Sequence, residues 1–116
     1  MILTPVEGFP TWTLYQSAEW LQQTTPPNTI VAAYQSGIMG YFSERTVLNL
    51  DGVVNAEALP HFLNGTIHDY LAAQSVDYLI DWEPLLTQYT DFEQLPKHQL
   101  RQLDDVSYIQ IVQFEE

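Results

Sequence analysis

Glycines lie just before one predicted strand in the sequence, and polar residues lie just after it. A small ligand site could be built from residues of these types at the ends of a strand. Gly37 and Gly40 precede the strand in the stretch SGIMGYFS, and Asp51 and Asn55 follow it in the stretch LDGVVN. A glycine-rich turn after a strand can bind phosphate. GIMG, however, lacks the third glycine of a dinucleotide fingerprint and the Gly-Lys-Ser/Thr ending of a P-loop. We therefore expect these glycines to allow a tight turn and close packing.

Asp51 follows a predicted strand, at the edge where open α/β sheets usually bind ligands. Its carboxylate could hold a metal or a sugar hydroxyl, or it could accept the N–H groups of Val53 and Val54 in an Asx turn. The Asp-Gly pair favours the turn, and Asn55 is more typical of a helix N-cap than of a ligand contact. The candidate ligand-binding residues are Gly37, Gly40, Tyr41, Asp51 and Asn55.

Three histidines, His61, His68 and His98, are the remaining candidates for metal ligands. His61 and His68 are two helical turns apart, but Gly65 is expected to break the helix between them, and no His-Glu-x-x-His pattern is present. We predict no metal site and no cofactor. A small hydrolase or metal-dependent enzyme built on Asp51 with His61 or His68 is the least favoured hypothesis.

The acidic and hydroxyl residues do not form a recognisable catalytic motif. Asp69, Asp77, Asp81 and Glu83 could supply an acid and base pair, but such a pair needs a shared cleft, and most of them are expected to be solvated. No Gly-x-Ser-x-Gly elbow marks a serine nucleophile. We predict that the chain is not an enzyme.

The charge balance excludes two classes of partner. Fifteen Asp and Glu residues oppose three Lys and Arg residues, which gives a net charge of −12. Nucleic acids and anionic lipid headgroups are bound through clustered positive charge, so neither is expected as a partner. The chain has no cysteine, which excludes disulfides and thiolate chemistry.

The elements that must position these residues alternate between helices and strands. Hydrophobic spacing and turn residues predict a helix over residues 14–24, capped by Thr13 with Gln16 and ended by Pro26. Further elements follow in order: a buried strand (28–34), one or two helical turns (36–43), a strand (45–50), a helical pattern (55–64), a short helix after Thr66, a strand (77–82), irregular turns (83–103) and a strand (106–114).

Two elements in this order carry mixed signals. The helical pattern of residues 55–64 contains Pro60, which would remove a backbone bond from a helix beginning at Asn55 and would fit well in one beginning near Leu59, and the sequence leaves both starts open. The last strand has mixed polar and apolar sides and is expected at a sheet edge. We predict a single small α/β domain over residues 1–116, of two or three layers, with about four strands in a mostly parallel sheet.

Several segments in this order resemble a known family. Thr25-Pro26, Gly37, Gly40-Tyr41-Phe42, Asn49-Leu50-Asp51-Gly52 with Asn55, and then Asp77-Tyr78-Leu79-Ile80 occur in sequence. Over residues 18–80, about half of the chain, they resemble the extramembrane C-terminal region of multi-spanning bacterial glycosyltransferases of the dolichyl-phosphate-mannose mannosyltransferase type. From Trp82 onward the chain carries no such resemblance.

The resemblance implies a non-catalytic accessory domain on the extracytoplasmic side of a bacterial membrane. Its partner would be the membrane-embedded part of the same polypeptide, which holds the lipid-linked sugar and the catalytic acid, and residues 1–12 would lead from that part. The domain would cover the active site or help to place an acceptor. The alternative is a free-standing module that binds a small molecule or carbohydrate at the edge formed by residues 37–55.

Overall fold

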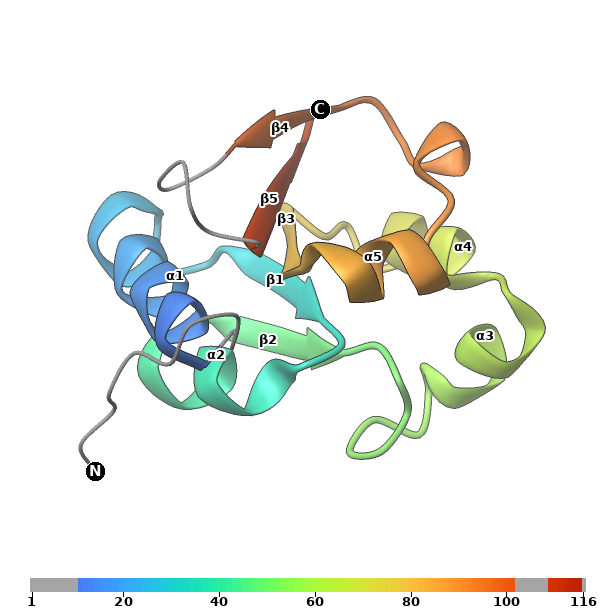
Figure 1. The fold of residues 1–116 in the computed structure, drawn as a ribbon, viewed down its shortest axis with the longest axis horizontal. Coiled ribbons are helices and arrows are strands. Elements are labelled where there is room, and N and C mark those ends of the chain that lie inside the picture. The colour runs from blue at the N-terminus through green and yellow to red at the C-terminus, as the bar shows by residue number, and fades with distance from the viewer. Residues whose placement is uncertain (1–10, 102–108, 116) are drawn as a thin grey trace.

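One sheet with helices on both faces forms the protein (Figure 1). The computed structural model describes residues 11–101 and 109–115, with side chains from Leu14 onward. The helices are α1 (Thr11–Thr24), α2 (Ser36–Phe42), α3 (Leu59–Asn64), α4 (Ile67–Ala73), α5 (Glu83–Tyr89) and the 3-10 helix η1 (Phe92–Gln94). The strands are β1 (Ile30–Ala33), β2 (Thr46–Asn49), β3 (Tyr78–Trp82), β4 (His98–Arg101) and β5 (Ile109–Phe114).

The sheet is mixed, with strand order β2-β1-β3-β5-β4. β1 pairs in parallel with β2 and β3, whereas β5 pairs in antiparallel fashion with β3 and β4. The expected α/β class is confirmed. The expectation of about four strands in a mostly parallel sheet is wrong, because the chain after β3 contributes two strands, and one of them, β5, runs antiparallel to both of its neighbours.

β4 and β5 account for the difference. β4 lies in the segment expected to form only turns, and it pairs outside β5, with Leu100 opposite Val112. β5 is therefore an interior strand, and its predicted edge position is wrong. Its mixed pattern has a simple cause: Ile111 belongs to the core on one face of the sheet, and Val112 belongs to the core on the other.

The helices divide between the two faces, which makes three layers. Figure 1 shows α1 and α2 together on one side of the molecule and α3, α4 and α5 on the other. Ile80 of β3 packs with α1 and α2, while its neighbour Leu79 packs with α4 and α5. Both side chains are fully buried, and each such burial stabilises the fold by about 1.5–3 kcal/mol.

The helix boundaries follow the proline and capping signals in part. α1 ends at Thr24, as Pro26 predicted, but it begins at Thr11, so Thr13 lies inside the helix and is not its cap. α3 begins at Leu59, which places Pro60 in the first turn, where its missing N–H is tolerated. One or two helical turns were expected for residues 36–43, and α2 provides them over seven residues.

Candidate functional site

The parallel strands β1, β2 and β3 end together, and we call this side of the sheet the carboxyl edge. The chain leaves β1 for α2 on one face and leaves β3 for α5 on the other, as the packing of Met39 and Leu86 into different cores shows. Open α/β sheets bind ligands between two strands whose connections diverge in this way. A site of this kind would lie between β1 and β3, beside Gln35 and Asp81.

Asp81 occupies that position and is completely buried. Its Oδ2 accepts the backbone N–H of Gln35 at 2.8 Å, and its Oδ1 accepts the backbone N–H of Trp82 at 2.7 Å. The Gln35 side-chain Nε2 also donates to Oδ1, at 3.1 Å. Burial raises the pKa of the Asp81 carboxyl, because desolvation outweighs the hydrogen bonds that favour its charged form. The carboxylate fastens the ends of β1 and β3 together and is closed to a substrate.

Asn49, at the end of β2, connects the chain segments on the β2 side of the carboxyl edge. Its Nδ2 donates to the carbonyl of Tyr34 and to Oγ of Ser36, both at 3.2 Å. Its Oδ1 accepts the N–H of Gly52 at 3.0 Å. One buried amide therefore holds the end of β1, the start of α2 and the turn after β2 in fixed positions.

The connection of residues 50–58, which we call the β2–α3 loop, contains two of the predicted ligand-binding residues. Asp51 accepts the N–H of Val53 at 2.9 Å in an Asx turn. Asn55 donates to the carbonyl of Asn49 at 2.9 Å and to the Tyr70 hydroxyl at 2.8 Å. The predicted N-cap role of Asn55 is wrong, because α3 begins four residues later. The Asn55 amide instead holds the loop by its bonds to Asn49 and Tyr70. Both side chains serve to shape the loop.

Gly52 permits the sharp bend of this loop. Its φ is +81°, a backbone region that other residues adopt only with strain. A Cβ at this position would lie 2.6 Å from Cβ of Leu59 and 2.8 Å from its Cα. The loop therefore crosses the start of α3 at a distance that only glycine allows.

The other three predicted residues, Gly37, Gly40 and Tyr41, lie on α2. Gly37 has open space where a Cβ would be, and a Cβ at Gly40 would make only an ordinary 3.9 Å contact with Val47. The expected tight turn is absent from these two positions, because both glycines are helical. Tyr41 is 79% exposed and packs edge-on against Phe42. The carboxyl edge therefore does not gather the five residues around one point.

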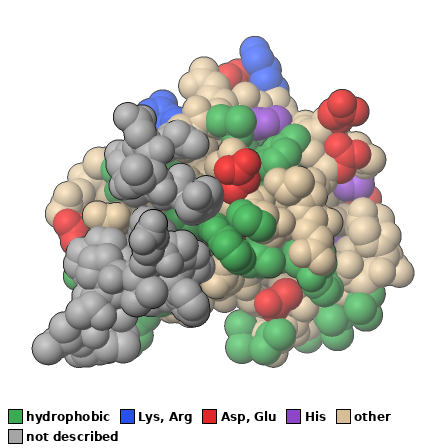
Figure 2. Space-filling view, viewed as in Figure 1, with side chains coloured by type: hydrophobic (Ala, Val, Ile, Leu, Met, Phe, Trp, Pro, Cys, Tyr) green, Lys and Arg blue, Asp and Glu red, His purple; other side chains and the backbone are tan. Residues whose placement is uncertain are grey.

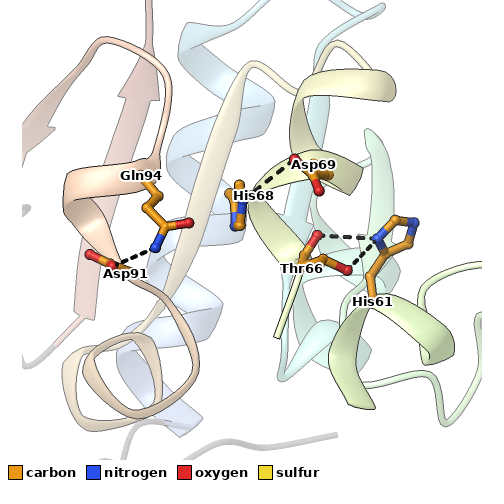
Figure 3. Close-up of polar contacts among 6 residues, drawn as sticks. All are labelled: His61, Thr66, His68, Asp69, Asp91 and Gln94. Atoms are coloured by element: carbon orange, nitrogen blue, oxygen red, sulfur yellow. Dashed lines mark hydrogen bonds and ion pairs between the residues drawn. The ribbon is translucent and has the colours of Figure 1, made fainter. Parts of the chain in front are cut away.

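The histidines are engaged separately, as Figure 3 shows for two of them. Nδ1 of His61 lies 2.9 Å from Oγ1 of Thr66 and 3.1 Å from its carbonyl oxygen. Nε2 of His68 lies 3.4 Å from a carboxylate oxygen of its neighbour Asp69. Among the residues that the structure describes, no three His, Asp or Glu side chains are placed to hold a metal ion.

Apolar side chains gather on the outside of the β2–α3 loop and α3. Val53 and Val54 are 81% and 77% exposed, and Leu63 is 71% exposed. Leu59, which contacts the loop, is 40% exposed. The loop reaches the lower margin of the molecule in Figure 1, and Figure 2 shows hydrophobic side chains along that margin. We call Val53, Val54, Leu59 and Leu63 the valine surface.

Sequence reasoning missed both Asn49 and Asp81, and it grouped Asp81 with acids expected to be solvated. A signal was present for Asp81, because a carboxylate within the apolar run YLIDW must be either exposed at a strand end or satisfied inside. The signal for Asn49 was weaker, because it consisted only of an amide residue at the end of β2. Its partners Tyr34 and Ser36 lie 15 and 13 residues away, beyond the range of local pattern.

Comparison with known proteins gives a family and no activity. Residues 8–113 match the family described as "Domain of unknown function (DUF8728)", and the chain therefore belongs to that family. No curated protein and no solved structure matches the chain significantly. Within the described residues, no helix combines the length and apolar character needed to cross a membrane.

Proposed function

We propose that this DUF8728 protein is a non-catalytic accessory domain of a membrane-embedded glycosyltransferase, exposed on the extracytoplasmic side. In this proposal the valine surface docks on the membrane-embedded part of the enzyme. One observation carries the proposal: Asp51 and Asn55 of the β2–α3 loop are bonded to the protein's own backbone, while the two valines between them are exposed. The loop belongs to the segment on which the family resemblance rests.

The internal bonding of the loop supports docking. Asp51, Asn55 and Gly52 already fix the loop, so little conformational freedom is lost when Val53 and Val54 are covered. Covering one valine contributes about 1.5–3 kcal/mol of hydrophobic free energy. The net charge of −12 disfavours anionic lipid headgroups as the covering surface, which leaves an apolar protein surface as the better match.

The same bonding weakens the alternative of a free-standing ligand-binding module at this edge. Asp51 already uses one carboxylate oxygen for the Val53 N–H, which leaves only its other oxygen for a sugar hydroxyl or metal. At the β1/β3 position, Asp81 is already satisfied and closed to solvent. An accessory domain does not need the carboxylate of Asp51 or of Asp81 to be available to a ligand.

Membrane fractionation and photo-cross-linking of the natural gene product test the proposal. The product should remain in carbonate-washed membranes, and a photo-cross-linking amino acid at Val54 should capture a membrane-embedded segment, identified by mass spectrometry. The same probe at the exposed Ala73, at the end of α4, serves as the control and should not capture it.

A second arm tests function. Val53→Asp combined with Val54→Asp should leave the fold intact, because both side chains are exposed, but should lower glycosyl transfer in the membrane fraction. The proposal fails if the natural product stays in the soluble fraction and no membrane-embedded protein is captured.

A further inference from the structure

The opposite end of the sheet, where β1 and β3 begin and β5 ends, contains a groove of about 530 Å³. Its lining includes Asn28, Asp77, Tyr78, Gln99, Gln113 and Glu115. This volume falls within the ~300–1,000 Å³ typical of small-molecule sites. We call it the amino-end groove, and it is separate from the carboxyl edge and from the valine surface.

Sheet register places a row of side chains in this groove. Gln113 of β5 is paired with Tyr78 of β3 on one side and with Gln99 of β4 on the other. Paired residues in antiparallel strands point to the same face, about 4.5–5.5 Å apart. An aromatic ring and two amides therefore stand side by side. Trp20 holds the Tyr78 ring by an edge-on contact at 5.6 Å.

Gln113 carries an unused acceptor. Its side-chain oxygen is buried and has no hydrogen-bond partner among the described residues. A buried acceptor without a partner costs about 1–3 kcal/mol. Rotation about the Cγ–Cδ bond, which is a soft torsion, would turn this oxygen toward the groove, where a donor from a ligand could pair with it. The same rotation places the amide nitrogen in the buried position, so the groove is offered the amide nitrogen before the rotation and the amide oxygen after it. A hydroxyl group can pair with either atom.

Charge in the groove selects the kind of donor. Its lining within the described part of the chain contains the carboxylates of Asp77 and Glu115 and no Lys or Arg. Asp77 accepts the N–H of Ile30 at 2.9 Å through one oxygen, and Glu115 pairs with Lys97 at 3.2 Å. Phosphate and carboxylate ligands would meet repulsion here. Amides and carboxylates accept hydrogen bonds from hydroxyl groups, and the aromatic side chains offer apolar contact to a ring.

The geometry points to the amino-end groove as a binding site for a neutral saccharide of one or two rings. Gln113 and Gln99 would pair with its hydroxyl groups, and Tyr78 would contact its apolar face. This inference does not depend on the docking proposed for the valine surface. It assigns a ligand class to Gln99 and Gln113, for which neither the family resemblance nor the carboxyl edge suggests a role.

Titration of the ¹⁵N-labelled chain with glucose, galactose, N-acetylglucosamine, maltose and lactose tests the inference. We expect saturable shifts of the Gln113 and Gln99 side-chain amides with at least one of these sugars, and no shifts in the β2–α3 loop. Shifts confined to that loop would overturn the groove as the site and would favour the alternative of a carbohydrate-binding module at residues 37–55 over the docking proposal. Glucose 6-phosphate should bind more weakly than glucose, and equal or tighter binding would overturn the neutral class.

Variants separate recognition from folding. Gln113→Leu removes the unpaired oxygen and keeps similar bulk, so it should fold with unchanged or higher stability and bind the sugar about tenfold more weakly or worse. Gln88→Leu, at an exposed position of α5, is the matched control and should bind as the wild type does. The inference is overturned if no sugar gives saturable shifts or if Gln113→Leu binds with unchanged affinity.

Discussion

Replacement of Gly52 by alanine should destabilise the protein more than any other glycine substitution among the described residues. Two effects act together at this position. The φ of +81° lies where an L-residue costs about 1–2 kcal/mol. The added Cβ would also meet Leu59 at 2.6 Å and 2.8 Å, closer than real Cβ atoms approach their neighbours.

The second effect is not easily relieved, because one of the two Leu59 atoms belongs to the backbone of α3. Overpacking of this kind costs about 1–3 kcal/mol. The sum for Gly52→Ala is therefore about 2–5 kcal/mol of unfolding free energy. A domain of this size loses roughly 4 °C in Tm per kcal/mol, so the melting temperature should fall by about 8–20 °C.

Two other glycines divide the effect into its parts. Gly65 has a φ of +70° but open space where an added Cβ would lie, so Gly65→Ala should show only the backbone part, about 1–2 kcal/mol. Gly37 is helical with open space, and Gly37→Ala should be neutral or stabilise by up to about 1 kcal/mol. Urea denaturation followed by circular dichroism measures all three. Equal losses for Gly52→Ala and Gly65→Ala would refute the contact between the loop and α3.

Two titration predictions follow from buried groups. Because the pKa of Asp81 is raised above its ordinary 3.8, the stability it contributes is greatest below that pH and is lost as the pH rises through the folded-state value. Denaturation at several pH values measures the free energy of unfolding of the wild type and of Asp81→Asn. The value for the wild type should fall relative to that for the variant as the pH rises above 3.8. A difference that does not change with pH would contradict the burial argument. Burial raises the pKa of Tyr34 to about 12 from 10.0, although its hydroxyl is bonded to Thr90 at 2.8 Å. Its stabilising contribution should be lost between pH 10 and about 12, by about 2–3 kcal/mol. Tyrosinate absorbance should show one late-ionising tyrosine that Tyr34→Phe removes, and full ionisation of the native protein near pH 10 would contradict this.

Local chemistry predicted the parts of the fold that depend on a few neighbouring residues. The Asx turn at Asp51 spans two residues, and the placement of Pro60 restricts α3 by the geometry of one ring. The buried strand β1 could be predicted because all four of its residues are apolar. In each case the signal and the structure it produces lie within the same short segment.

The remaining features depend on partners that are distant in the sequence. β4 has mostly exposed side chains and no apolar alternation, and it is a strand because the edge of β5 offers it hydrogen bonds. Asp81 is tolerated in the core because Gln35, 46 residues earlier, supplies donors. The groove beside Gln113 likewise exists only once β3, β4 and β5 are aligned, so its residues gave no pattern along the chain.

The position of β3 has a consequence for how the protein folds. β3 is the only strand shared by the parallel pair with β1 and the antiparallel pair with β5 within the described sheet. Its side chains Leu79 and Ile80 are buried in the cores on opposite faces. Neither half of the sheet can open without uncovering this strand, so we expect the domain to unfold in one cooperative step. Loss of β5 alone would leave an apolar edge of the kind that promotes aggregation.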